Sequence, residues 1–246
     1  MNFCGPILDR ALVPSTFACR QGKGSLAAVF HAQKRCLRNP WFVKMDVRRY
    51  FDSIDHIILM RLLARKFKGP GVLGLFERTL AGYHTQPGKG LPIGALTSQY
   101  FANFYLDGFD RGLLAQGLVK SHVRYMDDVV CWCESRQAAR TVLKFARVWL
   151  SEKRKLELKA NAQVHRSVLG MSFLGFLIQP NRLSLSKRRK IRYRKALDGW
   201  ERAYRAGNIS ALELQNNYSS VHSVVAHAES RAWRCRLLQI REPLEV

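Results

Sequence analysis

The residues best suited to chemistry are the two adjacent aspartates of Tyr125-Met126-Asp127-Asp128. Stretches that favour β-strands precede and follow them, so the sequence predicts a hairpin with the carboxylates at its turn. Two neighbouring carboxylates repel one another, and burying them would raise a pKa. A divalent cation such as Mg²⁺ removes this repulsion, because hard cations are bound by carboxylate oxygens. The stretch therefore predicts a third carboxylate elsewhere in the chain and a polyphosphate substrate.

The third carboxylate is predicted upstream, at Asp46. It lies near the end of the largely apolar stretch 42–47, which is typical of a buried strand. The aromatic pair Tyr50-Phe51 and Asp52 follow, with no role expected for Asp52. Asp55 then stands where it can cap a helix that extends to Lys66.

These stretches together resemble a known family. Motif A of reverse transcriptases resembles Asp46 with the aromatic pair, and motif C resembles Tyr125-Met126-Asp127-Asp128. Motif B resembles the segment Gly90–Asn103 between them. The ordered match runs from about residue 13 to residue 180. A YxDD tetrapeptide alone is a weak signal, whereas three motifs in the correct order are a specific one. The resemblance implies an α+β fold with a right-hand polymerase palm, whose antiparallel sheet is backed by helices, with shortened fingers and a small helical thumb.

On this basis we expect three regions. Residues 1–40 would form partial fingers, residues 41–180 the palm with motifs A to E and embedded fingers helices at about 55–90, and residues 181–246 a basic helical thumb. Within the palm we expect a helix from Thr97, another at 136–150, and strands at 156–159, 164–168 and 172–178. Asp107 and Asp110 fall on the expected motif B helix, and we expect them at the surface.

The reaction implied by the resemblance transfers a phosphoryl group from a deoxynucleoside triphosphate to a primer 3′-hydroxyl. Two metal ions, Mg²⁺ or Mn²⁺, would stabilise both the attacking and the leaving oxygens. Asp46 and Asp127 are the expected bridging ligands, Asp128 would complete the metal shell, and the carbonyl of Val47 is a further ligand by resemblance. Positioning and charge neutralisation supply most of the rate in phosphoryl transfer, so no His or Cys nucleophile is needed.

The resemblance also implies contacts to the substrates. Phe51 would collide with a 2′-hydroxyl and so select deoxynucleotides, and Tyr50 would take this role if the strand register slipped by one residue. Arg20 and Lys23 lie in a basic, Gly-rich turn before a helix that Ser25 can cap, and they match a fingers element that holds the triphosphate. Gln99 is expected at the nascent base pair, and Tyr125 is a further expected substrate-binding residue. The remaining contacts are the primer grip, Phe173, Leu174 and Gly175, and the phosphate-binding thumb residues, Lys187, Arg188, Arg189, Lys190, Arg192 and Arg194.

The composition points to a polyanionic partner. The 246 residues carry 41 Lys and Arg against 18 Asp and Glu, a formal charge of +23 that is spread along the chain. A solubilising surface usually needs a much smaller net charge, and nucleic acid is the first candidate. No long apolar span favours a membrane partner. Six scattered cysteines without a CxxC pair, and no signal peptide, indicate reduced thiols in a cytoplasmic protein, encoded by a bacterium or a phage according to the resemblance.

Two short stretches indicate a branch of the family. Thr97-Ser98-Gln99 and the segment Ala18–Gly24 resemble the diversity-generating retroelement enzymes, which copy a template RNA into error-prone cDNA, often with a small basic accessory protein. Retron-type, group II intron and defence-associated enzymes are alternatives. We therefore expect an RNA template, a DNA or RNA primer and dNTPs as partners. The competing functions are a non-catalytic nucleic-acid-binding palm protein and an RNA-templated RNA polymerase, the latter disfavoured by Phe51.

Overall fold

The computed structural model describes residues 3–241 and residue 244. The chain divides into two compact units, Met1–Ser167 and Val168–Val246. This boundary falls inside the range 41–180 that the sequence assigns to the palm. None of the described helices is long and apolar enough to cross a membrane.

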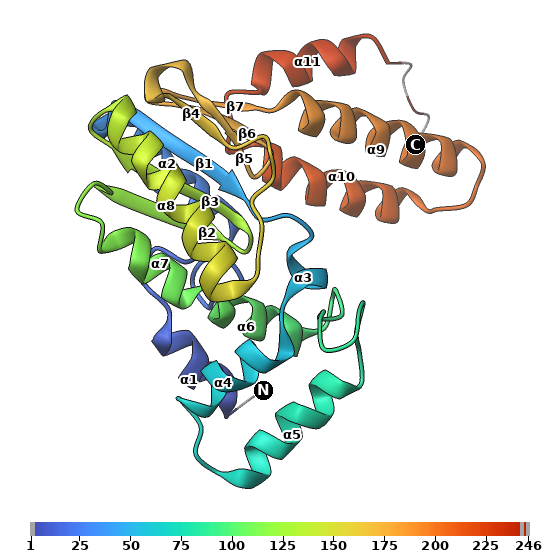
Figure 1. Cartoon of the computed structure of the whole chain (residues 1–246). Coiled ribbons are helices and arrows are strands. Elements are labelled where there is room, and N and C mark those ends of the chain that lie inside the picture. The colour runs from blue at the N-terminus through green and yellow to red at the C-terminus, as the bar shows by residue number, and fades with distance from the viewer. Residues whose placement is uncertain (1–2, 242–243, 245–246) are drawn as a thin grey trace. The chain divides into compact units, whose positions relative to one another are not determined.

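The first unit is built on a four-stranded antiparallel sheet. Its strands are β1 (Trp41–Asp46), β2 (Ser121–Tyr125), β3 (Asp128–Cys133) and β4 (Gln163–Arg166), in the spatial order β2-β3-β1-β4 (Figure 1). The predicted hairpin is confirmed, because β2 and β3 pair directly and the turn between them consists of Met126 and Asp127. The chain then places β1 beside β3, so the predicted acidic strand lies against the predicted acidic turn.

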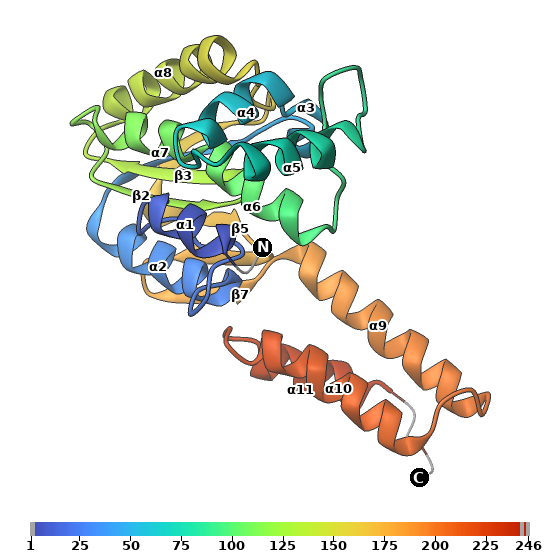
Figure 2. The ribbon, with the colours of Figure 1, turned by 90° about the horizontal axis from the view of Figure 1, so that it is seen from below.

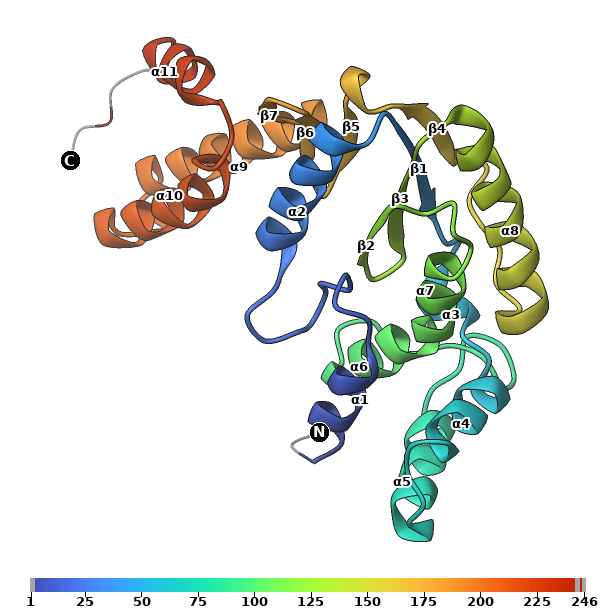
Figure 3. The ribbon, with the colours of Figure 1, turned by 90° about the vertical axis from the view of Figure 1, so that its left-hand side faces the viewer.

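Helices cover both faces of this sheet. The helices of the first unit are α1 (Cys4–Ala11), α2 (Ser25–Arg38), α3 (Tyr50–Ser53), α4 (His56–Ala64), α5 (Pro70–Ala81), α6 (Leu96–Tyr105), α7 (Asp107–Leu114) and α8 (Arg136–Arg154). Helix α2 lies on one face, and α7 and α8 lie on the other (Figures 2 and 3). Helix α8 buries Ala139, Val142, Ala146 and Leu150, whose helical spacing forms one apolar stripe against β1 and β3.

Several local expectations are decided by these elements. Asp55 does cap α4, because its side chain accepts a hydrogen bond from the backbone N–H of Ile58. The expected Ser25 cap is wrong, since Gly24 is the N-cap of α2 and Ser25 is already helical. The expected strand at 156–159 is also wrong, because this segment makes only one isolated bridge, from Leu158 to Val47.

The outer edge of β2 is covered by an N-terminal segment. The backbone N–H of Arg124 donates to the carbonyl of Ser15 over 3.0 Å, and that of Phe17 donates to the carbonyl of Arg124 over 2.9 Å. Thr16, between them, forms a parallel bridge with Arg124. Residues 15–17 therefore act as a short additional strand beside the hairpin.

In its described residues, the second unit combines a small meander with three helices. Its strands are β5 (Met171–Phe173), β6 (Phe176–Gln179) and β7 (Arg182–Leu185), preceded by a short 3₁₀ helix, Ser167–Leu169, that begins at the unit boundary. The single strand expected at 172–178 is a hairpin instead, because Leu174 and Gly175 both have positive φ and reverse the chain. The helices are α9 (Lys187–Arg205), α10 (Ala211–Val225) and α11 (Arg231–Gln239), which confirms three helices in this region.

Candidate active site

The three predicted carboxylates come together at one end of the first sheet. Asp46 is the last residue of β1, and it pairs in register with Asp128, the first residue of β3. Asp127 lies in the turn before Asp128, and its carbonyl accepts a hydrogen bond of 3.3 Å from the backbone N–H of Val47. The residue that reverses the chain is Met126, which has φ of 54°. The turn therefore holds the two aspartates of the hairpin against the end of β1.

The site concentrates negative charge in a partly dehydrated place. Burial raises the pKa of Asp128 to about 6, an effect opposed by Lys44 and reinforced by Asp46 and Asp127. Burial also raises the pKa of Asp127, and the nearby Asp46 carboxylate adds to this increase. The protein thus keeps these carboxylates together at an electrostatic cost, as is common at functional sites.

Two lysines compensate this charge, and the sequence analysis had assigned a role to neither. Lys159 Nζ lies 2.6 Å from Oδ1 of Asp46, and Lys44 Nζ lies 3.4 Å from Oδ1 of Asp128. Neither carboxylate oxygen accepts a well-directed hydrogen bond, so these contacts are ion pairs. The signal for Lys44 was present in the sequence, because residues two apart in a strand share a face and Lys44 is two residues before Asp46.

The carboxylate cluster has the chemistry of a site for hard cations. Its donors are carboxylate oxygens, which Mg²⁺ and Mn²⁺ prefer. Oδ1 of Asp46 and Oδ1 of Asp128 are almost inaccessible to solvent, and the ammonium groups of Lys159 and Lys44 lie beside them, where a metal cation would bind. As the side chains stand, however, the described residues contain no group of three or more His, Cys, Asp or Glu side chains already arranged around a metal position. The ammonium groups of Lys44 and Lys159 would have to withdraw when an ion binds.

A buried arginine supports the hairpin turn that contains Met126 and Asp127. The side chain of Arg124 is fully buried, and its guanidinium contacts both carboxylate oxygens of Asp110 at 2.7–2.8 Å. It also donates to the carbonyl of Met126 over 3.1 Å and to the carbonyl and side-chain oxygens of Asn103 over 3.0 Å. Arg124 therefore connects the turn to both α6 and α7.

This network corrects the expectation for Asp107 and Asp110. The predicted motif B helix ends at Tyr105, and both aspartates belong to α7, the following helix. Asp110 has no exposed surface, and Asp107 is about nine-tenths buried. Burial would raise the pKa of Asp110, but the positive charge of Arg124 and the neighbouring His122 ring hold it below its ordinary value. The sequence signal for this pair is an arginine inside a predicted hairpin strand, where burial requires an acidic partner.

The two aromatic residues after Asp46 have different environments. Tyr50 is 3% exposed, and its hydroxyl donates to the carbonyl of Ala102, so it belongs to the core. Phe51 is only half-buried and contacts the Tyr50 ring edge-on, with 5.7 Å between the ring centroids. Of the two, Phe51 is the one whose ring remains available to a substrate.

Gln99 and Tyr125 lie close to a residue that the sequence analysis did not select. Gln99 is at the start of α6, and its Oε1 accepts a hydrogen bond of 3.0 Å from the thiol of Cys19. Burial raises the pKa of Tyr125, and Cys19 adds to this shift. Cys19 has φ of 50°, a left-handed conformation that is uncommon outside glycine. These three residues therefore form one group beside the hairpin.

Arg20 and Lys23 make internal contacts in the structure. The Arg20 guanidinium is 11% exposed, forms an ion pair of 2.6 Å with Asp9, and donates to the carbonyls of Val13 and Thr16. Lys23 donates to the carbonyls of Pro14 and Thr16 and lies 5.0 Å from the Phe17 ring centroid. A triphosphate could recruit these cations only at the expense of contacts that fix the N-terminal segment.

The predicted primer-grip and thumb residues lie in the second unit. Phe173 is buried, and Leu174 and Gly175 form the β5–β6 turn. Arg189 donates to the carbonyl of Leu174 over 2.9 Å and lies over Phe176, occupying the space that a side chain at residue 175 would need. Lys190 lies 5.5 Å from the Trp233 ring centroid. The exposed basic residues of the predicted set are Lys187, Arg188, Arg192 and Arg194.

Comparison with known proteins places this arrangement in context. Protein YkfC of Escherichia coli K12 is 27% identical to this chain over 95 residues, which are 36% of this chain and 23% of that protein. A group II intron-encoded protein, LtrA of Lactococcus lactis subsp. cremoris, is 35% identical over 80 residues, 30% of this chain and 13% of its own length. The putative COX1/OXI3 intron 2 protein of Saccharomyces cerevisiae is 29% identical over 101 residues, 38% of this chain and 12% of its own length. The matched segments therefore span less than a quarter of these relatives.

Solved structures agree on the fold. The structure of apo telomerase from Candida tropicalis superposes with a TM-score of 0.60 at 12% identity, covering 97% of this chain and 50% of that one. A telomerase structure from Candida albicans gives a TM-score of 0.57 at 12% identity, covering 97% and 48%. These likenesses confirm the α+β palm-like fold. The family profile described as reverse transcriptase (RNA-dependent DNA polymerase) matches residues 7–178, well over half of the chain. With its acidic strand, acidic hairpin and palm-like sheet inside the matched range, the chain belongs to the reverse transcriptase (RNA-dependent DNA polymerase) family.

Proposed function

We propose that the protein is an RNA-directed DNA polymerase that adds deoxynucleotides to a primer 3′-hydroxyl on an RNA template. The observation that carries this proposal is the convergence of Asp46, Asp127 and Asp128 at the adjoining ends of β1 and β3. A protein that only binds nucleic acid gains nothing from three clustered carboxylates facing a polyanion. Membership of the reverse transcriptase family supports the same conclusion.

In this proposal the carboxylates prepare the site for phosphoryl transfer. Asp46 and Asp127 would hold Mg²⁺ or Mn²⁺ between them, with Asp128 and the Val47 carbonyl as further ligands. Two such ions, when bound, supply charge stabilisation to the attacking and leaving oxygens. The primer 3′-oxygen bonds to the α-phosphorus and gives up its proton to solvent water, while the bond from the α-phosphorus to the bridging oxygen breaks and pyrophosphate leaves with the electron pair. Arg124 acts indirectly, since it fixes the Met126 carbonyl and hence the turn that carries Asp127.

The neighbouring residues would select and position the substrates. Phe51, half-buried after β1, is proposed to exclude the 2′-hydroxyl, because Tyr50 is committed to the core. Gln99 and Tyr125 would face the nascent base pair. We place Lys187, Arg188, Arg192 and Arg194 on template or primer phosphates, since these cations of α9 are exposed. Phosphate contacts of this kind bind without reading sequence.

The finer assignment is to a diversity-generating retroelement. It is supported by Thr97-Ser98-Gln99 and by the segment Ala18–Gly24, of which Cys19 contacts Gln99. The proposal then includes error-prone cDNA synthesis and a small basic accessory protein. The retron-type and defence-associated branches are the alternatives for the same chemistry.

Binding without catalysis is the second candidate, and one observation favours it. Lys44 and Lys159 neutralise two of the three carboxylates within the protein itself. If these ion pairs persisted in the presence of divalent ions, the palm would be a basic scaffold with an inactive centre.

Primer extension decides between the two candidates. The wild-type protein is given an RNA template, a DNA primer, dNTPs and Mg²⁺ or Mn²⁺, and it is compared with Asp127→Asn. Glu152→Gln is the matched control, because it removes the same charge from an exposed position on α8. We expect extension by the wild type and the control and none by Asp127→Asn, with salt-sensitive RNA binding by all three. Binding by all three without extension by any would replace the polymerase with the binding-only candidate.

A further inference from the structure

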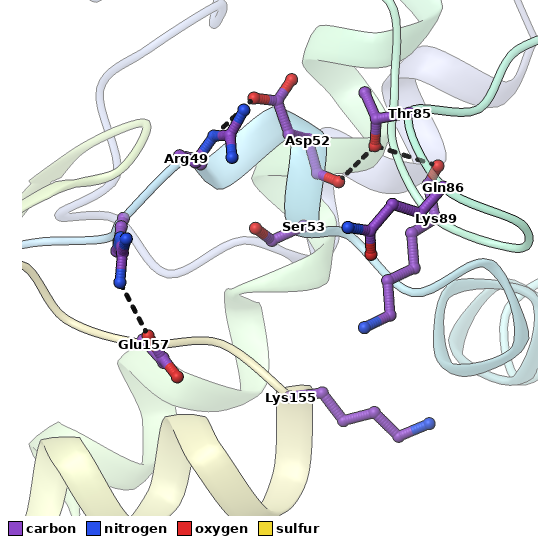
Figure 4. A pocket seen from close by; sticks show the side chains of 9 residues that line it. Arg49, Asp52, Ser53, Thr85, Gln86, Lys89, Lys155 and Glu157 are labelled. Atoms are coloured by element: carbon purple, nitrogen blue, oxygen red, sulfur yellow. Dashed lines mark hydrogen bonds and ion pairs between the residues drawn. The ribbon is translucent and has the colours of Figure 1, made fainter.

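A pocket of about 360 Å³ in the second unit has no role in the function proposed so far. It differs from the pocket of the first unit that Arg49 and Asp52 line (Figure 4), because that one follows closely after Asp46 and belongs to the proposed active centre. The pocket of the second unit is lined by side chains of α9 and of residues 233–240, a segment that comprises most of α11 and the residue after it.

The two helices that form this pocket are fixed to each other. Helix α11 lies beside α9 (Figure 1), and its Trp233 contacts the ring of the buried Tyr193, with 5.5 Å between the ring centroids. Just after α11, the guanidinium of Arg241 pairs with the carboxylates of Asp198 and Glu201 on α9. The pocket is therefore formed before any ligand arrives, which lowers the entropic cost of binding.

The charged side chains that line the pocket are all cations. They are Lys190, Arg194 and Arg236, and the described lining contains no carboxylate. Arg194 and Arg236 are exposed, and their side chains form no ion pair or hydrogen bond with any described residue. Asp198, one turn after Arg194 on α9, is already paired with Arg241. The two arginines are therefore available to carboxylates from outside the chain.

The remaining side chains of the lining are apolar, and two of them are unusually exposed. Ile191 is 49% exposed and Ile240 is 79% exposed, whereas Leu237 beside them is buried. Covering such side chains stabilises a complex by roughly 25 cal/mol for each Å² of apolar surface removed from water. The indole of Trp233 also contacts the ammonium of Lys190, which lies 5.5 Å from its ring centroid. Its ring is thus engaged within the protein rather than open to a stacking base.

We propose that this pocket is a docking site for an acidic segment of a partner protein, one that presents a bulky apolar side chain between carboxylates. The apolar side chain would pack against Ile191 and Ile240, and the carboxylates would form charge-assisted pairs with Arg194 and Arg236. A nucleic-acid strand fits less well, because its phosphates offer nothing apolar to cover the two isoleucines. The basic accessory protein considered above would be repelled by these cations, so the partner proposed here is a different one.

The proposed docking site is distinct from the cations of α9 that we place on nucleic acid. Arg188 and Arg192 are two positions away from Lys190 and Arg194, which is roughly 200° around the helix axis at 3.6 residues per turn. The chain could therefore hold RNA and the partner on different sides of α9, and Arg194 is the residue that both proposals use. The docking proposal depends on none of the proposed catalytic carboxylates.

Fluorescence anisotropy with the full chain tests the docking site. The probe is the fluorescein-labelled peptide Glu-Asp-Glu-Leu-Phe-Glu-Asp, and its control is Glu-Asp-Glu-Ser-Ser-Glu-Asp, which has the same charge. We expect the first peptide to bind about tenfold more tightly, because only it can cover the exposed isoleucines.

Variants of α11 and of the residue after it locate the binding. Arg236→Gln should weaken binding of the first peptide about tenfold, the loss of one charge-assisted contact. Ile240→Ser should weaken it severalfold, and the exposure of Ile240 makes unfolding of this variant unexpected. Arg231→Gln and Leu238→Ser are the matched controls, because they change exposed residues of α11 outside the lining, and they should leave the affinity unchanged.

Three results would overturn the proposal. The first is absence of peptide binding, and the second is equal affinity for both peptides, since a chain of charge +23 attracts any acidic peptide through charge alone. The third comes from titrating the same variants with labelled oligouridylate and with phosphatidylserine vesicles. If Arg236→Gln and Ile240→Ser weaken binding of either ligand as much as binding of the peptide, the pocket is a site for RNA or for a membrane surface instead.

Discussion

The ion pair between Asp110 and Arg124 gives the sharpest prediction about the first unit. Both side chains have no exposed surface, and the guanidinium contacts both carboxylate oxygens at 2.7–2.8 Å. Asp110→Asn keeps the volume but removes the negative charge, so Arg124 would be left charged in a dehydrated place. Removing one partner of a buried pair costs roughly 3–5 kcal/mol. This loss is a large part of the roughly 5–15 kcal/mol that stabilises a typical domain.

Urea unfolding followed by tryptophan fluorescence measures this effect. With a slope of roughly 2 kcal/mol per molar urea, the midpoint should fall by about 1.5–2.5 M. Asp107→Asn is the matched control, because Asp107 is on the same helix but pairs with a largely exposed Arg111, and it should cost no more than about 1 kcal/mol.

The double variant Asp110→Leu with Arg124→Met tests the reasoning further. Since neither charge remains, its free energy of unfolding should lie closer to the wild type than that of Asp110→Asn does. A loss of stability below about 1 kcal/mol for Asp110→Asn would show that the buried pair contributes little, and the role of Arg124 in holding the hairpin turn would be refuted.

Three further results are expected. Phe51→Ala should increase ribonucleotide incorporation relative to deoxynucleotide incorporation in primer extension, and unchanged discrimination would remove Phe51 from its proposed role. Burial, with Arg35 and other neighbouring charges, lowers the pKa of His31 from 6.5 to about 4. Because the unfolded state binds more protons between these pH values, the free energy of unfolding should fall as the pH is lowered from about 6.5 to 4. His31→Gln should reduce this dependence on pH in unfolding measured across that range, and the same dependence in both proteins would contradict the prediction. Arg188→Gln and Arg192→Gln should each remove about one phosphate contact from RNA binding. The slope of log affinity against log salt concentration should then become shallower by roughly 0.7–0.9, whereas Glu152→Gln should leave that slope unchanged.

The parts of the site that could be predicted from sequence are those fixed by local pattern. Asp127 and Asp128 at a hairpin turn follow from two β-prone stretches around an acidic pair, and Asp55 as a helix cap follows from its place before an apolar stretch. The approach of Asp46 to this turn was also foreseen, but through resemblance to a family, because strand order depends on contacts between distant segments.

Other features depended on tertiary contacts that local pattern does not contain. Asp110 is expected at the surface because aspartates usually are, whereas its partners Arg124, His122 and Thr16, from distant parts of the chain, make its burial tolerable. The segment 156–159 has strand-like alternation, but it lies beyond the end of the sheet's register and makes a single bridge. Lys159 reaches Asp46 from this segment, and its long side chain gives no periodic signal.

The pairing of residues 15–17 with Arg124 has a practical consequence for preparing this protein. A shortened version beginning after Phe17 would leave the outer side of β2 with unpaired backbone amide and carbonyl groups. Unpaired edge strands form hydrogen bonds with other chains and so cause aggregation. Shortened versions that keep residues 15–17 should stay monodisperse, whereas those that begin at Ala18 should self-associate through the hairpin that carries Asp127 and Asp128, losing solubility and the proposed active centre together.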